Sequence, residues 1–382
     1  MTAVEPSRHP ATAWVNLDRI RENFRAIRNH AGARAVIPVL KADAYGHGAI
    51  AVARALDPMG VAMFAVAYVE EGLALRRAGI TTPILILTGF APEQLNDVAA
   101  FNLTPVVSTA EQVRALQGLH RGEDEPRLPV HVKVDTGMAR LGFTLHELEP
   151  VIHRLEDAES IHLEGLMTHL SAADEDPTET ARQLDVFEEA ILRLETLGIR
   201  PRMIHAANSA GLAFTRASHS AVRPGLLLYG IPPRPLAPSI PVKPALELRA
   251  RVALVKTVPP GTRVSYGGHF VAAQETRIAT INAGYADGIP RTTLMREQGV
   301  LRHGPNALKV TGTVCMDLTM LDASLCPTLK AGDEVTVMGD SPGAWDLAEW
   351  AGTNAWQILT GVGSRVPRRY TLGGEILPPE PR

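Results

Sequence analysis

Apolar runs alternate with helical patterns along the first two thirds of the chain. Residues 18–30 place Ile20, Phe24 and Ile27 at helical spacing. Further helical patterns, such as 70–78 and 181–197, separate short apolar runs that are typical of buried parallel strands covered by helices. These runs predict strands at 36–40, 63–66, 84–87, 104–107, 130–134, 162–167, 203–207 and 221–225.

Eight strand–helix units over about 200 residues predict a closed (β/α)8 barrel of the TIM type. An open doubly wound sheet is the alternative. The proline-rich segment 231–245 predicts neither helix nor central strand. Beyond it, alternating runs predict a mainly antiparallel β domain, with one helix at about 344–360. We therefore predict an α/β plus β protein, with a barrel domain over 1–243 and a C-terminal β domain over 244–382. The alternating runs lie at 250–258, 276–283, 308–316 and 333–339.

Composition narrows the class of protein. The length of 382 residues suits about two domains, and 45% hydrophobic residues suffice for a folded core. With 38 basic and 41 acidic residues, the net charge of -3 argues against a nucleic-acid partner. Two cysteines, Cys315 and Cys326, predict no disulfide framework and a reduced, cytoplasmic location. No apolar run is long enough to span a membrane, and residues 1–10 lack a signal-peptide core, so export is not expected.

Lys41 follows the first predicted strand, where a barrel places its active site. Burial at a strand end favours the neutral amine of a lysine. A neutral amine is the form that a Schiff base with an aldehyde requires. The alternative is a lysine whose stem packs while its amine reaches water.

Small residues follow the last two barrel strands, at 208–211 and 224–226. Free backbone N–H groups there suit a phosphate, although plain turns are an equal alternative. Arg223 lies within the eighth run, and an arginine in a buried strand requires a partner. His169 follows the sixth run, and taken alone it is typical of an ordinary hydrogen-bonded histidine.

Lys133 and Arg140 lie near the end of the fifth run, so an anion is expected between them. Asp135, a ligand or a modified lysine are the open choices. Tyr285 lies in a glycine-rich turn of the second domain, and it acts as a base only if cations or a basic neighbour lower its pKa. Cys315 beside Asp317 does not support a metal site. Together these signals fit a cofactor that carries an aldehyde and a phosphate.

The motifs resemble those of the alanine racemase family, pyridoxal 5′-phosphate enzymes with a barrel and a C-terminal β domain. The resemblance extends from residue 13 to residue 368. The motifs, in the family's order, are VLKADAYGHG (39–48), KVDTGMARLGF (133–143), AANSAG (206–211), VRPGLLLYG (222–230), AGYADG (283–288) and CMD (315–317).

The resemblance implies a two-base racemisation of alanine. Lys41 would hold the cofactor and act as one acid/base group. Tyr285 would be the other, on the opposite face of a small amino-acid substrate. Tyr285, Met316 and Asp317 would come from the partner subunit, so that a homodimer shares its active sites. The D-alanine formed would supply peptidoglycan synthesis.

The resemblance also implies how the remaining site residues act on the cofactor and substrate. The phosphate would be held by Tyr45, Ser209, Gly225 and Leu226, with Asn208 adjoining. Arg223 would contact the pyridine nitrogen with support from His205, and His169 would pack beside the ring and bond to Tyr285. Arg140 would approach the phenolic oxygen and border the substrate, paired with a carbamylated Lys133. No metal is implied.

One departure from the family pattern concerns substrate specificity. The better-known members carry a tyrosine where this chain has Trp356, and that hydroxyl joins the phosphate shell and borders the substrate methyl. A racemase of broader specificity that also accepts serine therefore stays open, as does packing alone for Trp356. A basic-amino-acid decarboxylase of the same barrel-plus-β type is an alternative enzyme. Arg223 argues against it, because such decarboxylases place a carboxylate at this position, opposite the pyridine nitrogen. A non-catalytic cofactor carrier would need neither the second domain nor Tyr285.

Overall fold

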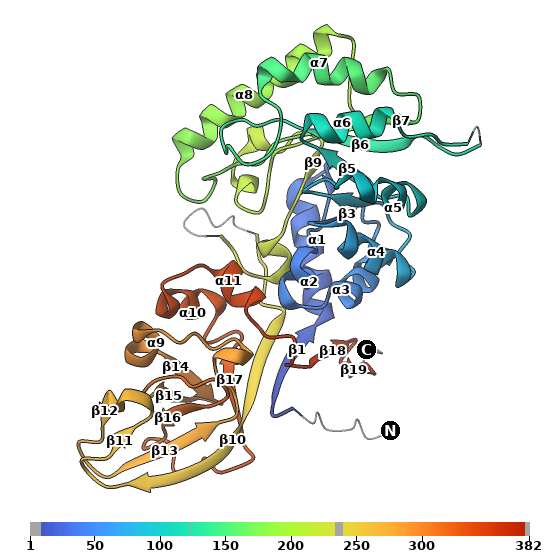
Figure 1. The fold of residues 1–382 in the computed structure, drawn as a ribbon. Coiled ribbons are helices and arrows are strands. Elements are labelled where there is room, and N and C mark those ends of the chain that lie inside the picture. Colours follow the sequence, from blue (N-terminus) through green and yellow to red (C-terminus); the bar gives the residue numbers. More distant parts are fainter. Residues whose placement is uncertain (1–8, 123, 234–239, 379–382) are drawn as a thin grey trace. The chain divides into compact units, whose positions relative to one another are not determined.

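The computed structural model describes residues 9–122, 124–233 and 240–378, which form two compact units (Figure 1). The barrel unit comprises Arg21–Ala44 and Ala49–Val242. The β unit comprises the chain up to Ile20, Tyr45–Gly48, and the chain from Lys243 onward.

Eight parallel strands form the barrel unit. Six of them pair in the order β3-β4-β5-β6-β7-β8, and β2 pairs with β9. The ring is closed by a parallel bridge between Val39 and Ala65 and by a hydrogen bond of 3.0 Å from Ser220 N to Ile204 O. The predicted barrel is confirmed, and the open sheet is excluded. Its strands are β2 (Ala35–Val36), β3 (Phe64–Val66), β4 (Ile84–Ile86), β5 (Thr104–Val107), β6 (Leu128–Lys133), β7 (Ile161–Met167), β8 (Met203–His205) and β9 (Ala221–Val222).

The longest helix between these strands, α8, begins at residues suited to capping. In α8, Pro177 takes the first position and the Asp176 carboxylate accepts from two backbone N–H groups of the first turn. The predicted apolar face of α1 is fully buried at Ile20 and Ile27. The helices are α1 (Leu17–Ala31), α2 (Lys41–Gly46), α3 (Ala49–Leu56), α4 (Val69–Arg77), α5 (Leu95–Ala100), α6 (Ala110–Gln117), α7 (Leu145–Glu156) and α8 (Pro177–Thr196). Short 3-10 helices include η3 (Gly211–Ala213) and η5 (Leu226–Tyr229).

An apolar cluster fills the inside of the barrel, with at least one member from most of its strands. Full burial of one aliphatic side chain of this kind contributes about 1.5–3 kcal/mol. The barrel is therefore a packed core, and its polar chemistry is confined to the strand ends and to a few buried polar side chains. The cluster consists of Ile37, Val39, Met63, Ala65, Leu85, Val106, Met167, Met203 and Ala221.

A nine-stranded sheet forms the β unit, in the order β13-β16-β15-β14-β17-β10-β1-β18-β19. Because β10 also pairs with β13, the strands from β13 to β10 close into an antiparallel ring, as the predicted fold class requires. The members are β1 (Ala11–Asn16), β10 (Leu246–Val258), β13 (Thr276–Ile281), β14 (Val300–His303), β15 (Asn306–Val310), β16 (Thr319–Asp322), β17 (Glu334–Met338), β18 (Arg368–Leu372) and β19 (Glu375–Ile376). A separate hairpin joins β11 (Arg263–Val264) and β12 (Phe270–Val271).

Strand β1 was not predicted from the sequence. It is antiparallel to β10, beside which it runs in Figure 1, and parallel to β18. Its side chains alternate between buried and less buried after the first three positions. The first strand of the chain therefore belongs to the same sheet as strands near its end.

The single helix predicted at about 344–360 is wrong. The structure has two helices there, α10 (Ala344–Ala351) and α11 (Ala355–Thr360), besides α9 (Thr293–Gln298) earlier in the unit. Gly352 ends α10 with a φ of 67°, a left-handed conformation that glycine adopts at low cost. The Asn354 side chain then accepts from Gln357 N and begins α11.

Part of the predicted proline-rich linker, 234–239, lies outside the described residues. Residues 231–233 and 240–245 contain neither helix nor strand, as predicted for the linker. Across the described ranges, no helix is both long and apolar enough to cross a membrane.

Candidate active site

Lys41 begins a left-handed helical turn. In α2, residues 42–45 have φ between 51° and 53°, which is the left-handed region. This conformation costs about 1–2 kcal/mol per non-glycine residue. Two carboxylates stabilise the turn: Asp43 Oδ1 accepts from Ala49 N at 2.8 Å, and Glu71 Oε1 accepts from Ala42 N at 2.7 Å. Strain of this kind, maintained by surrounding contacts, is typical of functional sites.

The two glycines after this turn are required by close packing. A Cβ on Gly46 would lie 2.5 Å from Leu359 O, and one on Gly48 would lie 1.9 Å from the Tyr370 hydroxyl. Both glycines also have positive φ, 79° and 89°. Arg368 Nε donates to Gly46 O at 3.1 Å. The spacing of glycines in the YGHG motif therefore follows from the shape of the β unit.

The Lys41 amine is half-buried at the end of the first barrel strand. Burial lowers its pKa, and the nearby Arg140 lowers it further, while Glu71 opposes both. Among the described residues, the amine takes part in no hydrogen bond or ion pair. The site thus shifts the amine toward its uncharged, nucleophilic form, which is the direction expected from the sequence.

Lys133 lies at the end of β6 and is only 5% exposed. Burial, followed by the charges of Arg140 and Arg223, lowers its pKa to about 8. Asp135, one candidate for the anion between Lys133 and Arg140, instead accepts backbone N–H groups of its own turn at 3.0 and 3.1 Å. No ion pair joins it to either cation in the part of the chain that the structure describes. Asp135 therefore stabilises its own turn. It does not act as the anion expected between Lys133 and Arg140.

Arg223 is buried, with 3% exposure and no carboxylate partner among the described residues. Its NH1 donates to His205 Nδ1 at 2.6 Å and to His205 O at 2.8 Å. Its NH2 donates to Thr168 O at 2.7 Å and to Ala206 O at 3.0 Å. Burial lowers the pKa of the guanidinium to about 9, so it is still a cation at neutral pH. None of these bonds uses Nε, which leaves one N–H for a neutral acceptor.

His169 follows β7 and is half-buried. Burial lowers its pKa well below the ordinary value, and the charges of Arg223 and Lys133 lower it further. The imidazole is therefore neutral at physiological pH, which lets one ring nitrogen accept a hydrogen bond.

Ser209 and the start of η5 are joined by hydrogen bonds within the barrel unit. Ser209 Oγ accepts from Gly225 N at 3.0 Å and from Leu227 N at 3.2 Å. Leu226 N, between these two, donates to none of the acceptors described. Asn208 Oδ1 accepts from Gly211 N at 2.8 Å and fixes the preceding turn. The structure thus brings the predicted phosphate-binding residues of the barrel unit together.

Tyr45 and Trp356 belong to the β unit. Tyr45 lies in the left-handed turn, is 6% exposed, and has its pKa raised by burial, so the hydroxyl keeps its proton. Trp356 is half-buried in α11 and packs edge-on against Trp345, with ring centroids 5.9 Å apart. Packing against Trp345 therefore accounts for part of the Trp356 ring.

Tyr285, Met316 and Asp317 are neighbours in the β unit. Tyr285 begins η7 (Tyr285–Asp287), and its backbone N–H donates to Cys315 O at 3.0 Å. Tyr285 is 42% exposed and Met316 is 53% exposed, so both side chains face outward from this unit. The structure thus groups the three residues that the sequence assigns to a partner's site.

Two site-associated residues were missed by the sequence analysis. His131 lies two residues before Lys133 in β6, and its Nδ1 is 2.8 Å from His205 Nε2. Arg365 binds Asp287 in the turn of Tyr285. The signal for His131 was a polar residue inside an otherwise apolar strand, whereas Arg365 had no distinguishing local pattern.

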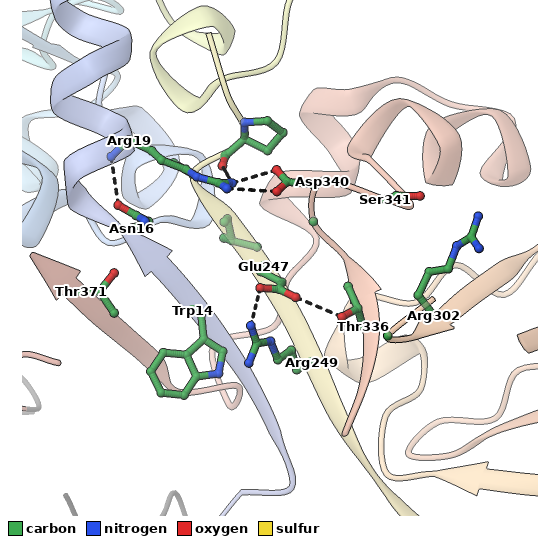
Figure 2. A pocket seen from close by; sticks show the side chains of 15 residues that line it. Trp14, Asn16, Arg19, Glu247, Arg249, Arg302, Thr336, Asp340, Ser341 and Thr371 are labelled. Atoms are coloured by element: carbon green, nitrogen blue, oxygen red, sulfur yellow. Dashed lines mark hydrogen bonds and ion pairs between the residues drawn. The ribbon is translucent and has the colours of Figure 1, made fainter. Parts of the chain in front are cut away.

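A cavity of about 350 Å³ in the β unit contains none of the predicted site residues (Figure 2). Within it, Arg19 binds both carboxylate oxygens of Asp340, at 2.8 and 3.0 Å. Glu247 pairs with Arg249 at 2.7 Å and accepts from the Thr336 hydroxyl at 3.0 Å. These charges pair with one another, and the bond from Thr336 to Glu247 joins β17 to β10.

The protein is a parallel barrel with a lysine amine and further cations at its strand ends, the architecture of a barrel enzyme. Residues 15–233 match the profile described as "Alanine racemase, N-terminal domain", and residues 245–370 match the C-terminal domain of the same family. The alanine racemase of Sorangium cellulosum is 41% identical over 378 residues, which cover 94% of this chain and 99% of the relative.

Two solved structures extend the comparison. An alanine racemase of Clostridium difficile 630 has a TM-score of 0.91 at 32% identity, covering 97% of this chain and 98% of the other. An alanine racemase of Bartonella henselae, with covalently bound pyridoxal phosphate, has a TM-score of 0.85 at 28% identity, covering 96% and 100%. The chain belongs to the alanine racemase family, and its activity is that of an amino-acid racemase.

Proposed function

We propose that this chain interconverts L-alanine and D-alanine with pyridoxal 5′-phosphate, using Lys41 and Tyr285 as acid/base groups on opposite faces of the substrate. The family assignment and the cofactor of the Bartonella henselae structure support this proposal. The observation that carries it is the Lys41 amine, which has a lowered pKa and lies at the end of the first barrel strand.

The donor set of the barrel unit fits this cofactor. When bound, the cofactor supplies an aldehyde that joins an amine and a conjugated ring that accepts the electron pair left by the departing α-proton. Lys41 would hold the aldehyde carbon, and Arg223 Nε would donate to the ring nitrogen without giving up its proton. Ser209, Gly225 and Leu226, with Asn208 adjoining and Tyr45 from the left-handed turn, would hold the phosphate. This list comprises the predicted cofactor contacts other than Arg140 and His169.

Racemisation requires a proton to leave Cα on one face and another to arrive on the opposite face. Lys41, as a neutral amine, can take the proton on its face. Tyr285 would act on the other face, with its hydroxyl hydrogen-bonded to His169, whose neutral imidazole can accept that bond. Arg140 would lie near the cofactor's phenolic oxygen and the substrate, with Met316 and Asp317 beside the substrate.

The proposed modification of Lys133 follows from its charge state. Carbamylation joins a neutral amine to carbon dioxide and releases one proton, and a pKa of about 8 makes the neutral amine accessible near neutral pH. The resulting carbamate would give Arg140 the anion that Asp135 does not provide. Mass measurement of the intact protein under alkaline conditions tests this assignment. An unmodified Lys133 in bicarbonate buffer would contradict it.

We also propose a homodimer in which the partner subunit supplies Tyr285, Met316 and Asp317. Tyr285, Met316 and Leu318 are exposed apolar or amphipathic side chains of one region, at 42%, 53% and 37%. Such clusters favour an interface with another protein. Mixing two inactive variants, Lys41→Ala and Tyr285→Phe, tests it. A shared site predicts partial recovery of activity, because some mixed dimers regain one complete site, whereas separate sites predict no recovery.

Broader specificity is the second candidate, and Trp356 favours it. An indole offers one N–H and no acceptor, so it does not reproduce the tyrosine hydroxyl of the better-known members. Racemisation of L-alanine and L-serine, each with and without added pyridoxal phosphate, tests both candidates. Alanine turnover that requires the cofactor supports the main proposal, and comparable serine turnover supports the second. A yellow protein inert toward both amino acids would instead be a cofactor carrier.

The proposed location is the cytoplasm, and the proposed use of D-alanine is peptidoglycan synthesis. Cys315 and Cys326 are both free thiols, which supports a reducing compartment. Growth of a depletion strain with and without added D-alanine tests the metabolic role. Lysis that D-alanine prevents would support it, and growth without D-alanine would count against it.

A further inference from the structure

Arg223 is the first member of a line of three buried side chains in the barrel unit. Its NH1 lies 2.6 Å from His205 Nδ1, and His205 Nε2 lies 2.8 Å from His131 Nδ1. Both imidazoles are 0% exposed. Their ring centroids are 5.0 Å apart, with the planes tilted by 59°. The line therefore runs from the predicted cofactor contact into the barrel interior.

Only one arrangement of protons satisfies this geometry. A guanidinium can only donate, so His205 Nδ1 must accept. Burial and the charge of Arg223 lower the pKa of both imidazoles, that of His131 to about 3, so both are neutral. His205 then carries its proton on Nε2 and donates it to His131 Nδ1. A proton on either Nδ1 would set two donors against each other.

The far end of the line is an unpaired donor. His131 must carry its proton on Nε2, and this atom is buried with no hydrogen-bond partner in the described part of the chain. An unpaired buried donor destabilises a fold, and an apolar side chain would avoid that cost. Packing alone therefore does not explain why position 131 is a histidine. The hydrogen bond that His131 Nδ1 accepts from His205 Nε2 does explain it.

The neighbouring strand leaves room for this ring. His131 in β6 pairs in register with Gly165 in β7, next to a register shift between Val130 and His131. A Cβ on Gly165 would lie 2.4 Å from His131 Nδ1, so any side chain there would displace the imidazole. The sequence thus provides both the imidazole of His131 and, at Gly165, the space that this ring occupies.

We propose that His131 is a positioning residue: its Nδ1 keeps the proton of His205 on Nε2, so that His205 Nδ1 fixes the guanidinium of Arg223. The guanidinium then holds its Nε N–H free for the ring nitrogen of the cofactor. This last step rests on the proposed function, but the arrangement of protons does not.

Two variants of equal size separate the acceptor from the packing. His131→Asn can place an amide oxygen near the position of Nδ1, and His131→Leu cannot. Nitrogen-15 NMR of the full chain, labelled at histidine, reports the proton position of His205 without added cofactor, and a His205→Gln sample assigns the signal. We expect the Nε2–H form in the parent and in His131→Asn. In His131→Leu we expect a mixture of both forms, because the Nε2 proton loses its acceptor, while NH1 of Arg223 can keep its bond to His205 O when the proton moves to Nδ1.

Kinetics and absorbance of the protein with pyridoxal phosphate give the second readout. We expect kcat for L-alanine to fall about tenfold in His131→Leu, with an altered visible band of the bound cofactor, and to recover in His131→Asn. Gly165→Ala should reproduce the mixed proton positions through displacement of the ring, which covers the case in which His131→Leu does not fold.

Two results would overturn the inference. One is a single Nε2–H form of His205 in both His131→Leu and Gly165→Ala. The other is equal loss of activity in the Asn and Leu variants, which would mean that only the ring's shape matters. Failure of the proposed function would look different: the parent would neither bind pyridoxal phosphate nor racemise alanine, while the NMR result would still decide the role of His131.

Discussion

Arg365 donates to both oxygens of the Asp287 carboxylate, with Nε 2.8 Å from Oδ1 and NH2 2.9 Å from Oδ2. Asp287 is 1% exposed, and its Oδ2 also accepts from Gly284 N at 2.9 Å. The same NH2 lies 2.7 Å from Asp317 Oδ1. One guanidinium therefore ties the turn of Tyr285 to the segment of Asp317, and bonds to both carboxylates raise its pKa.

Replacement of Arg365 should loosen Tyr285 and Asp317 together. We expect Arg365→Gln to lower kcat for L-alanine about tenfold, because the proposed base loses its fixed position. The kcat of Arg365→Lys should lie between those of the parent and Arg365→Gln, since a lysine keeps the positive charge but lacks the planar, bidentate guanidinium. Steady-state kinetics measure the effect. Arg77→Gln, at an exposed arginine that ends α4, serves as the control. Parent-like kinetics in both Arg365 variants would refute the positioning role.

Tyr285→Phe should damage the two directions unequally. If Tyr285 serves one face and Lys41 the other, loss of the phenol should slow deuterium exchange at Cα of L-alanine by about 100-fold or more, and that of D-alanine less. Exchange in heavy water, followed by NMR, measures both rates. Tyr266→Phe is a control in the same unit, at 68% exposure. Equal losses for both enantiomers would contradict the assigned faces.

Ala42→Gly should stabilise the protein. Ala42 is exposed and has a φ of 52°, where alanine is disfavoured and glycine is not. Relief of this strain, less the backbone entropy of glycine, should raise the free energy of unfolding by about 0.5–1 kcal/mol. Ala74→Gly, exposed in the right-handed helix α4, should lower it by about 0.5–1 kcal/mol. Urea unfolding compares them, and losses of the same sign would argue against a left-handed turn in solution.

The stability of protein freed of bicarbonate should rise with pH because of Lys133. Its folded-state pKa is about 8 against an ordinary 10.5. Below the lower value both states carry the proton, and folding must bury the charge. Between the two values the unfolded state binds more protons, so the free energy of unfolding should rise by about 3 kcal/mol in total.

Lys133→Met should lack this rise, whereas Lys256→Met, at an exposed lysine, should keep it. Urea unfolding at several pH values measures the slopes. Added bicarbonate should flatten the slope of the parent, because a carbamylated lysine no longer titrates as an amine. Identical slopes in the parent and in Lys133→Met would contradict a buried, titrating Lys133.

Much of the fold could be predicted because its signals are local. The eight barrel strands are short apolar runs, and each lies within a few residues of its predicted place. Strand β1 could not be found this way, since Val15 pairs with Leu246 and Tyr370, both far away in the sequence. The break after α10 was missed because helical periodicity continues across Gly352 and Asn354.

The residues of the candidate site also divide into those with a local sequence signal and those defined by distant contacts. Lys41, Ser209 and Arg223 were found because each lies at or next to the end of a predicted barrel strand. His131 and Arg365 were missed because their partners, His205 and Asp287, are 74 and 78 residues away. The roles proposed for them come from contacts that only the folded chain creates.

The position of β1 between β10 and β18 affects how the molecule can be synthesised. Ala13 pairs with Arg368, so during synthesis β1 has to wait until β18 has been made before its place in the sheet is complete. A fragment that starts at Lys243 would lack this strand, leaving backbone edges of β10 and β18 unpaired and prone to aggregate. Expression of this fragment alone should therefore give inclusion bodies, and adding residues 9–16 as a separate peptide should improve its solubility.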